Sequence, residues 1–246
     1  MIKTAFHIQK GGTGKTSLSG NCSYCAAEHI KTVLVDADPQ GNSSSWFITN
    51  SFKHELADVL RDDVPLNDAM VQIKDNLYIL PTFSINGLLK EFAETKLSEQ
   101  PYVFDDLCKN LEGLGFGLAV FDLSPGMSML ERRVLAAMQE IITPVLPEGF
   151  SYDGIEIFNA ELQNINKRWR KNVLHRKIVV NNINRSIRSH MEYYDLIKSL
   201  DYDLYTVAQD SKIKEAQIYN QSIFEYDPKS KTIPEINNLT KSILRG

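Results

Sequence analysis

Short apolar runs alternate with longer amphipathic stretches along almost the whole chain. The runs are rich in branched and aromatic side chains, as buried strands are, and they are Ile2–Ile8, Thr32–Asp36, Asn76–Leu80, Gly117–Asp122, Ile141–Leu146, Lys177–Asn181 and Leu204–Ala208. The stretches with helical spacing predict helices near residues 15–29, 54–60, 86–97, 101–112, 128–138, 151–169, 187–199, 211–220 and 234–245. This alternation predicts an α/β fold with a doubly wound, mostly parallel sheet that is covered by helices on both faces.

One domain is expected for residues 1–246. No internal repeat, low-complexity tract or long linker interrupts the alternation. The 246 residues, of which 43% are hydrophobic, suffice for one sizeable core. Pro, Gly, Asn and three serines favour turns in "DPQGNSSSWF", so residues 38–47 are predicted to form a mobile loop.

The composition argues against several classes of protein. A net charge of -4 argues against a surface that is basic throughout, although it is compatible with a local basic patch. The N-terminus lacks a basic and then apolar leader, and no apolar run approaches the roughly 18 residues of a membrane span. Three cysteines, an odd number, fit a reducing compartment, so a soluble cytosolic protein is expected.

A phosphate-binding loop is predicted directly after the first strand. The motif G-x-x-x-x-G-K-[ST] ends here at Gly14, Lys15 and Thr16. Its first position holds Gln9 instead of glycine, and an extra lysine, Lys10, follows. In a loop between a strand and a helix, backbone N–H groups and the helix N-terminus can hold phosphates. Lys15 is then expected to bridge phosphate oxygens, and the Thr16 hydroxyl to ligate Mg²⁺.

Two later strands run into carboxylates that can converge on this loop. Asp36 and Asp38 end one apolar strand, and Asp122 ends another. In an open α/β sheet, ligands bind at the carboxyl ends of the strands. Asp122 is therefore predicted to hold Mg²⁺ through water as the Walker B aspartate.

Four segments resemble the deviant Walker A ATPases of the ParA/Soj type, which are relatives of MinD. They are "KGGTGKT" (10–16), "VLVDADPQGN" (33–42), "FDLSPG" (121–126) and "IKEAQIYNQSIFEYDPKSK" (213–231). The first segment marks the wider superfamily, whereas the second and the last narrow the resemblance to the partition group. The similarity extends from the first strand to the last helix.

The resemblance implies an ATPase whose site is completed by a second copy of the chain. Lys10 is similar to the signature lysine that reaches the partner's phosphates, Asp38 to the residue that positions the attacking water, and Asp36 to a residue near the metal. Asn181 lies where the family has an adenine-contacting asparagine, although Asn182 could serve. ATP and Mg²⁺ are the implied cofactors. The implied catalytic residues are Lys10, Lys15 and Asp38. The implied nucleotide-binding residues are Lys10, Gly11, Gly12, Thr13, Gly14, Lys15, Thr16, Ser17 and Asn181. The implied metal ligands are Thr16, Asp36 and Asp122.

The chain departs from the family's usual sequence in places. The family has two prolines after the Walker B aspartate, where this chain has Ser124 and then Pro125. "MLERRVL" carries Glu131, Arg132 and Arg133 in a stretch that is commonly neutral. The departures leave the predicted phosphate and metal ligands in place, so they bear on turnover and on the choice of partner.

Positive charge gathers in the second half of the chain. From Leu162 to Met191 there are eight Lys or Arg residues and no Asp or Glu. Such a patch on two subunits is predicted to hold duplex DNA through its phosphates, whereas a solvated basic helix end is the alternative. Arg185 and Lys212 also resemble basic positions of Soj-like proteins. The candidate DNA-binding residues are Lys167, Arg168, Arg170, Lys171, Arg185, Arg188 and Lys212.

Other functions share much of this pattern. A MinD-like, membrane-associated positioning ATPase has the same phosphate site, but the C-terminal stripe of Ile236, Leu239 and Ile243 is short and is expected to dock on the core. A metabolic ligase or iron–sulfur reductase component of the same superfamily is another alternative, although Cys108 is the only cysteine in the middle of the chain. A nucleotide-gated binding protein without turnover is the third.

The resemblance favours an ATP-hydrolysing DNA partition protein. ATP and Mg²⁺ are expected to promote a sandwich homodimer that binds non-specific DNA. A ParB-like centromere-binding protein is expected to stimulate hydrolysis and release. No stable membrane association is expected, and the expected location is cytoplasmic and nucleoid-associated.

Overall fold

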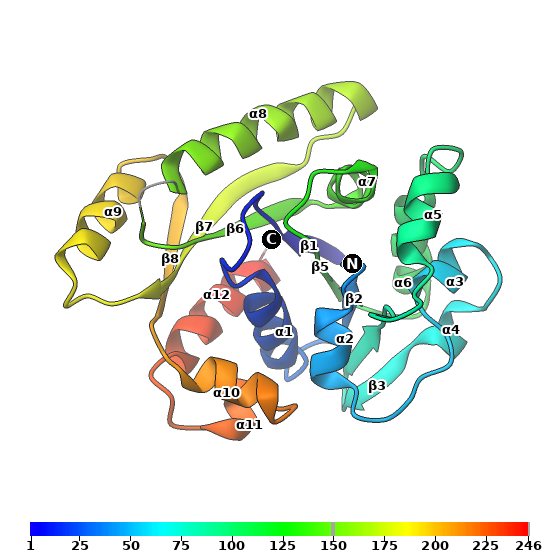
Figure 1. The fold of residues 1–246 in the computed structure, drawn as a ribbon, viewed down its shortest axis with the longest axis horizontal. Helices are drawn as coiled ribbons and strands as arrows, with labels where there is room; N and C mark the ends of the chain where they lie inside the picture. Colours follow the sequence, from blue (N-terminus) through cyan, green and yellow to red (C-terminus); the bar gives the residue numbers. More distant parts are fainter. Residues whose placement is uncertain (149–150, 246) are drawn as a thin grey trace.

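The computed structural model describes residues 1–148 and 151–245. Within these residues, eight strands form one sheet with the order β3-β4-β2-β5-β1-β6-β7-β8 (Figure 1). Neighbouring strands of this described sheet run parallel, except for the antiparallel pair β3 and β4. The strands are β1 (Ile2–Phe6), β2 (Thr32–Asp36), β3 (Val71–Lys74), β4 (Leu77–Leu80), β5 (Leu118–Asp122), β6 (Glu140–Val145), β7 (Leu174–Ile183) and β8 (Asp203–Ala208).

The predicted α/β class and the predicted strands are confirmed, with differences at the strand ends. β7 is the largest difference, since it extends beyond the predicted residues at both ends. β3 is the strand that the sequence did not predict. It is a short edge strand with no fully buried residue, and it pairs with β4 alone in the described sheet. A half-exposed edge strand lacks the apolar run that marks a buried one.

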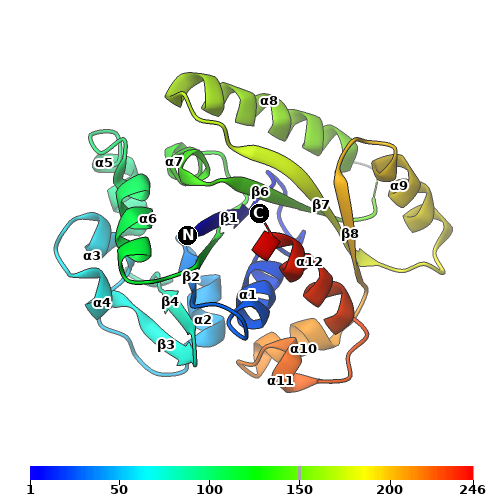
Figure 2. The same ribbon diagram turned by 180° about the vertical axis from the view of Figure 1, so that it is seen from behind.

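The helices lie on both faces of the sheet (Figures 1 and 2). Those of the described residues are α1 (Lys15–Ala26), α2 (Asn42–Phe47), α3 (Leu56–Leu60), α4 (Leu66–Ala69), α5 (Leu89–Thr95), α6 (Val103–Gly113), α7 (Met129–Ala137), α8 (Ser151–Trp169), α9 (Arg188–Lys198), α10 (Lys212–Ile218), α11 (Ile223–Tyr226) and α12 (Ile233–Arg245).

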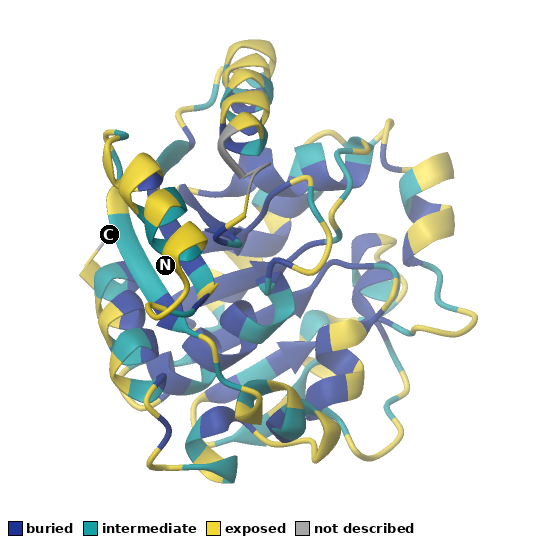
Figure 3. Ribbon diagram, turned by 60° about the vertical axis from the view of Figure 1, so that its left-hand side comes forward, coloured by how far each residue is buried: buried dark blue, intermediate teal, exposed yellow. Residues whose placement is uncertain are grey.

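Alternating side chains of the central strands build one core on each face. Ala5 and Phe121 point into a cluster with α3, α5, α6, α7 and α8. Phe6 and Val120 point the other way, into a cluster with α1, α2, α11 and α12. The central strands are therefore buried on both sides, as their dark blue colour in Figure 3 shows. Burial on both faces explains why β2 and β5 are continuous apolar runs in the sequence.

The segment predicted as a mobile loop, residues 38–47, contains a helix, so that prediction is wrong. α2 buries Ser43, Ser44 and the aromatic pair Trp46 and Phe47. Trp46 packs so closely on α1 that a Cβ atom on Gly20 would lie 2.2 Å from its ring. Tertiary packing thus outweighs a composition that favours turns.

The C-terminal helix packs on the core, as predicted. In α12, the apolar stripe of Ile236, Leu239 and Ile243 is buried beside α1 (Figure 2). This docking leaves the stripe unexposed, in contrast to an amphipathic membrane-binding helix. No helix among residues 1–148 and 151–245 is both long enough and apolar enough to cross a membrane.

Candidate functional site

The predicted phosphate-binding loop connects β1 to the N-terminus of α1. Gly12 and Gly14 have φ angles of 73° and 95°, a left-handed conformation that favours glycine. Gly14 is also the N-cap residue of α1, and no side chain caps the first turn. The loop therefore turns sharply and leaves the first N–H groups of a long helix open to an anion.

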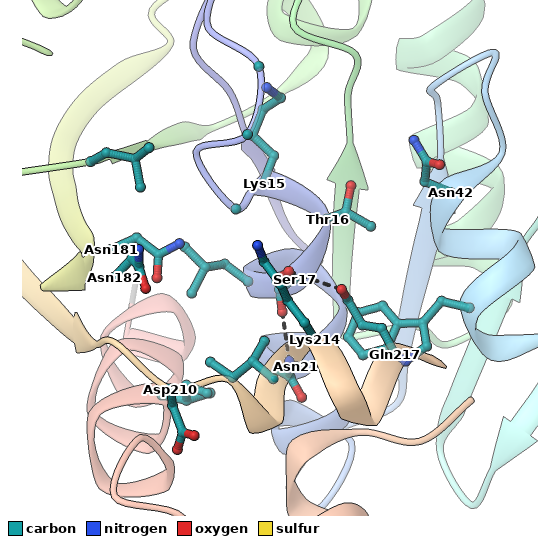
Figure 4. A pocket seen from close by; sticks show the side chains of 18 of the residues that line it. Lys15, Thr16, Ser17, Asn21, Asn42, Asn181, Asn182, Asp210, Lys214 and Gln217 are labelled. Atoms are coloured by element: carbon teal, nitrogen blue, oxygen red, sulfur yellow. Dashed lines mark hydrogen bonds between the residues drawn. The ribbon is translucent and has the colours of Figure 1, made fainter. Parts of the chain in front are cut away.

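A cleft of about 880 Å³ opens above this helix end, at the carboxyl edge of the sheet (Figure 4). The loop, the end of β7 and α10 form its walls. Of the residues predicted from the sequence, those that line it are Gly11, Gly12, Gly14, Lys15, Thr16, Ser17, Asp38 and Asn181. One cleft therefore brings together most of the predicted nucleotide-binding residues.

Lys15 is held inside the loop that precedes it. Its Nζ atom donates to the carbonyl oxygen of Lys10 at 2.9 Å and to that of Ile8 at 3.4 Å. Burial lowers the pKa of Lys15, while the nearby Asp122 and Asp38 carboxylates act in the opposite direction. The amine is thus fixed at the mouth of the helix, where its charge can reach a phosphate.

Lys10 points to a different side of the loop. Its Nζ atom donates to Glu148 Oε1 at 2.7 Å, and the lining of the cleft among the described residues does not include it. Lys10 instead borders a second hollow, of about 350 Å³, together with Thr13 and Ile157. The two lysines of the motif therefore face different surroundings.

Asp122 is fully buried at the end of β5, directly before the cleft residue Leu123. Its Oδ2 atom accepts a hydrogen bond from Ser43 Oγ at 2.6 Å, whereas its buried Oδ1 atom has no partner among the described residues. Burial raises the pKa of Asp122 to about 6, and the Ser43 and Thr16 hydroxyls oppose this rise. A buried carboxylate oxygen without a partner, on a carboxyl group whose pKa a threonine hydroxyl lowers, fits the oxygen ligands that Mg²⁺ prefers.

Asp36 and Asp38 occupy two different environments. Asp36 is fully buried and accepts bonds from the Ser44 N–H at 2.7 Å and from Ser44 Oγ at 2.6 Å. Asp38 lines the cleft, and its carboxylate accepts a bond from the Gln40 N–H at 2.9 Å. Asp36 thus faces α2 and Asp38 faces the cleft, so the role of Asp36 near the metal stays a prediction.

The buried carboxyl group of Asp36 predicts a pH-dependent stability. Burial, and next the charge of Asp122, raise the pKa of Asp36 to about 8. The folded state therefore keeps a proton that the unfolded chain loses near pH 4, so stability is lost progressively as the pH rises from about 4 to about 8. Without Mg²⁺, we expect the free energy of unfolding to fall by about 1 to 3 kcal/mol between about pH 5 and pH 8.

Urea unfolding of the parent and of Asp36→Asn in a metal chelator measures this dependence. Asparagine mimics the neutral acid, so the variant should lose much of the slope. Asp153→Asn, at an exposed carboxylate of α8, is the matched control. Parallel pH profiles of the parent and Asp36→Asn would show that Asp36 is already ionised in the folded protein.

The wall opposite the loop contains both predicted asparagines and two residues that the sequence did not single out. Asn181 and Asn182 both line the cleft; Asn181 Nδ2 donates to the carbonyl of Thr13 at 2.8 Å, and Asn182 has a φ of 60°. Gln217 on α10 donates to Ser17 Oγ at 2.9 Å (Figure 4). Polar residues at helical spacing in α10 are the signal that could have identified Gln217 and also Lys214, another residue of the cleft.

The predicted basic patch divides into two groups. Lys167, Arg168, Arg170 and Lys171 lie at the far end of α8, next to α6 and α7. Arg185 and Arg188 precede and begin α9, on the opposite side of the molecule in Figure 1. α8 has 19 residues, and at 1.5 Å per residue it separates the groups by roughly 28 Å.

Carboxylates from other parts of the chain neutralise several of these cations. Lys171 pairs with Asp105 at 2.5 Å, and Lys212 on α10 pairs with Asp227 at 2.5 Å. The buried Lys177 pairs with Glu140. Arg188 pairs with Glu192 of the same helix at 2.8 Å, whereas Arg185 has no ion pair among the described residues. The loops after β7 and β8 are connected by a hydrogen bond of 3.1 Å from Asn184 Nδ2 to Gln209 Oε1.

Comparisons with known proteins agree with this site. The model of the family described as "AAA domain" matches residues 1–176. The uncharacterized protein BBD21 of Borreliella burgdorferi is 43% identical over 241 residues, which cover 97% of this chain and 98% of that protein. The sporulation initiation inhibitor protein Soj of Bacillus subtilis is 25% identical, and the alignment covers 96% of this chain and 95% of Soj.

A solved structure shows the same fold. It is a putative plasmid partition protein from Borrelia burgdorferi B31 bound to AMPPNP. The two folds superpose with a TM-score of 0.82 at 17% sequence identity, over 99% of this chain and 98% of that chain. The resemblance that the motifs indicated is therefore confirmed at the level of the family. The chain belongs to the AAA-domain family of P-loop ATPases and is a ParA/Soj-type ATPase of partition or positioning.

Proposed function

We propose that this chain, as one domain of residues 1–246, is an ATP-hydrolysing DNA partition protein that forms an ATP-dependent sandwich homodimer. The observation that carries the proposal is the direction of Lys10. This lysine of the phosphate loop pairs with Glu148 and stays outside the lining of its own cleft, while Lys15 serves that cleft. A cation directed away from its own site supports the proposal that it serves the site of a second copy. A second cation at the phosphates stabilises the charge that develops in phosphoryl transfer.

Residues of the cleft have separate roles in this proposal. Lys15 and the N-terminus of α1 bind the phosphates, and Asp38 accepts a hydrogen bond from the attacking water. Thr16 and Asp122 would hold Mg²⁺, since the Oδ1 atom of Asp122 has no partner among the described residues and the Thr16 hydroxyl is close enough to lower the pKa of the same carboxyl group. When bound, the metal neutralises phosphate charge. Asn181 or Asn182 contacts the adenine from the end of β7.

The proposed DNA surface consists of Arg185, Arg188 and Lys212 beside the cleft. These residues are exposed: Arg185 lies on the loop after β7, whereas Arg188 and Lys212 begin α9 and α10. The loops after β7 and β8 are joined by the bond from Asn184 to Gln209, and Asn182 and Asp210 beside them line the cleft. Nucleotide and DNA would therefore meet neighbouring parts of the same loops. Contacts with phosphates alone bind DNA without reading its sequence.

The salt dependence of DNA binding tests this surface. With ATP, the parent should bind duplex DNA with an affinity that falls steeply between about 50 and 200 mM salt. Arg185→Ala with Lys212→Ala should weaken binding about tenfold or more and reduce the salt slope by about 1 for each lost phosphate contact. Fluorescence anisotropy measures both quantities, and light scattering checks that the variant still dimerises.

Lys90→Ala, at an exposed lysine of α5, is the control for a general loss of positive charge. DNA binding that does not depend on the salt concentration, or a double variant with the affinity of the parent, would remove this surface from the proposal.

A ParB-like centromere-binding protein is the proposed activator of hydrolysis. The proposed location is the cytoplasm, in association with the nucleoid.

A further inference from the structure

Two arginines enclose a tryptophan at the far end of α8. The guanidinium carbon of Arg133, on α7, lies 4.9 Å from the ring centroid of Trp169, and that of Arg168 lies 5.6 Å from it. Arg133 Nη1 also donates to the carbonyl of Pro101 at 3.3 Å, which ties the stack to the start of α6. The packed ring holds both guanidinium groups in place, so little side-chain freedom remains to be lost on binding.

This stack carries positive charge that nearby carboxylates do not neutralise. Among the ion pairs of the described residues, none contains Arg133, Lys167 or Arg168. Two acids of the adjoining helices α6 and α8 are engaged with other cations, since Asp105 pairs with Lys171 and Glu161 pairs with Arg132. Burial lowers the pKa of Arg133, and the charge of Arg168 lowers it further. The cluster thus retains mutual repulsion that an external carboxylate can relieve.

A hollow of about 350 Å³ adjoins the stack on the side of α6. Pro101 and Tyr102 border it, and Tyr102 is 62% exposed although it is aromatic. The apolar residues that line the hollow are Val59, Leu60, Val103 and Leu107. Pro101 belongs to both features, because its carbonyl accepts the bond from Arg133. The hollow is mixed in character, since Gln100, Asn110 and two aspartates line it beside the apolar side chains. An exposed aromatic ring over a partly apolar hollow, beside an unneutralised cationic cluster, is typical of a surface that binds a peptide.

We propose that this surface, made by Tyr102, Arg133, Lys167, Arg168 and the hollow, binds a segment of another protein in which acidic side chains follow an apolar one. The apolar side chain enters the hollow against Tyr102, and the carboxylates pair with Arg133 and Arg168. The surface lies away from the nucleotide cleft, at the other end of α8, so binding does not require ATP. The inference goes beyond the proposed function.

The geometry favours such a segment over nucleic acid. The cations form a short cluster rather than a stripe that could follow a phosphate backbone. Asp62 and Asp106 also border the hollow, where they would repel phosphates. Asp106 itself pairs with Lys109 at 2.8 Å. The acidic end of a bound segment must therefore point toward α8, and its apolar end toward α6.

Selection from a library of short displayed peptides tests the proposal. The library is first depleted on the folded variant Lys167→Glu with Arg168→Glu, and binders are then selected on the parent chain. We expect enrichment of peptides with a large apolar residue beside Asp or Glu. In fluorescence anisotropy, Arg133→Gln with Arg168→Gln should weaken such a peptide about tenfold or more, and Tyr102→Ala should weaken it several-fold.

Two matched controls isolate the surface. Arg185→Gln with Arg188→Gln removes two cations near the cleft, and Tyr219→Ala removes an aromatic ring that is 65% exposed directly after α10. Both should bind the peptide as the parent does, with or without ATP. The proposal is wrong if no peptide is enriched, if the enriched peptides lack acidic residues, or if the Lys167→Glu with Arg168→Glu variant loses DNA binding instead. If Arg185→Gln with Arg188→Gln loses ATP-dependent DNA binding, that result bears on the proposed function and does not test the peptide surface.

Discussion

Lys15→Ala should lower the affinity for ATP by about 100-fold, which corresponds to roughly 3 kcal/mol. Lys15 lies at the mouth of α1 with its amine directed at the carbonyls of its own loop. A bound phosphate replaces these neutral acceptors with a charged one, so the loss of the amine removes charge-assisted bonds. Titration with a fluorescent ATP analogue measures the change in affinity.

The fold should survive this substitution. Burial disfavours the charged amine of Lys15, as its lowered pKa shows, so the melting temperature should stay the same or rise. Lys214→Ala, at a second lysine of the same cleft, is the matched control and should cost much less affinity. An affinity within about threefold of the parent would show that Lys15 does not contact the phosphates.

Asp38→Ala should lower the rate of ATP hydrolysis by about 100-fold or more while ATP binding changes little. Asp38 lines the cleft, but its carboxylate is held by the Gln40 N–H at the turn before α2 rather than by the phosphate loop. This position suits a group that orients water and not one that binds the nucleotide. Phosphate release under saturating ATP, together with light scattering, measures turnover and dimer formation on the same sample.

The size of the complex is the informative part of that experiment. The variant should remain a dimer with ATP for longer than the parent, because hydrolysis no longer ends the bound state. Asp210→Ala removes another carboxylate that lines the cleft, and it should hydrolyse ATP as the parent does. Equal hydrolysis by Asp38→Ala and the parent would remove the water-positioning role.

The sequence predicted the parts of the fold that depend on local patterns. β2 and β5 are buried on both faces, so their apolar runs are visible whatever surrounds them. β3 and α2 escaped prediction because their neighbours define them. β3 is completed by pairing with β4, and α2 by the contacts of Trp46 with α1 and of Ser44 with Asp36.

The same distinction applies to the site. The loop residues and the carboxylates at strand ends converge because the topology of a parallel sheet brings them together. The direction of Lys10 is not encoded in the motif, since it depends on Glu148 from a distant part of the chain. The basic segment looked like one patch because residues close in sequence were counted together. In space, α8 separates its two halves, and Asp105 and Glu140 neutralise part of its charge.

The position of α2 has a consequence for spectroscopy. α2 joins Asp122 through Ser43, and its Trp46 donates from Nε1 to the carbonyl of Gln221 at 2.9 Å. A ligand that draws Asp122 away from Ser43 thus disturbs the helix that carries Trp46. The other of the two tryptophans, Trp169, lies between two guanidinium groups at the far end of α8. The chain therefore contains its own pair of emission probes, one for the nucleotide cleft and one for the remote surface, and a single substitution to phenylalanine separates their signals.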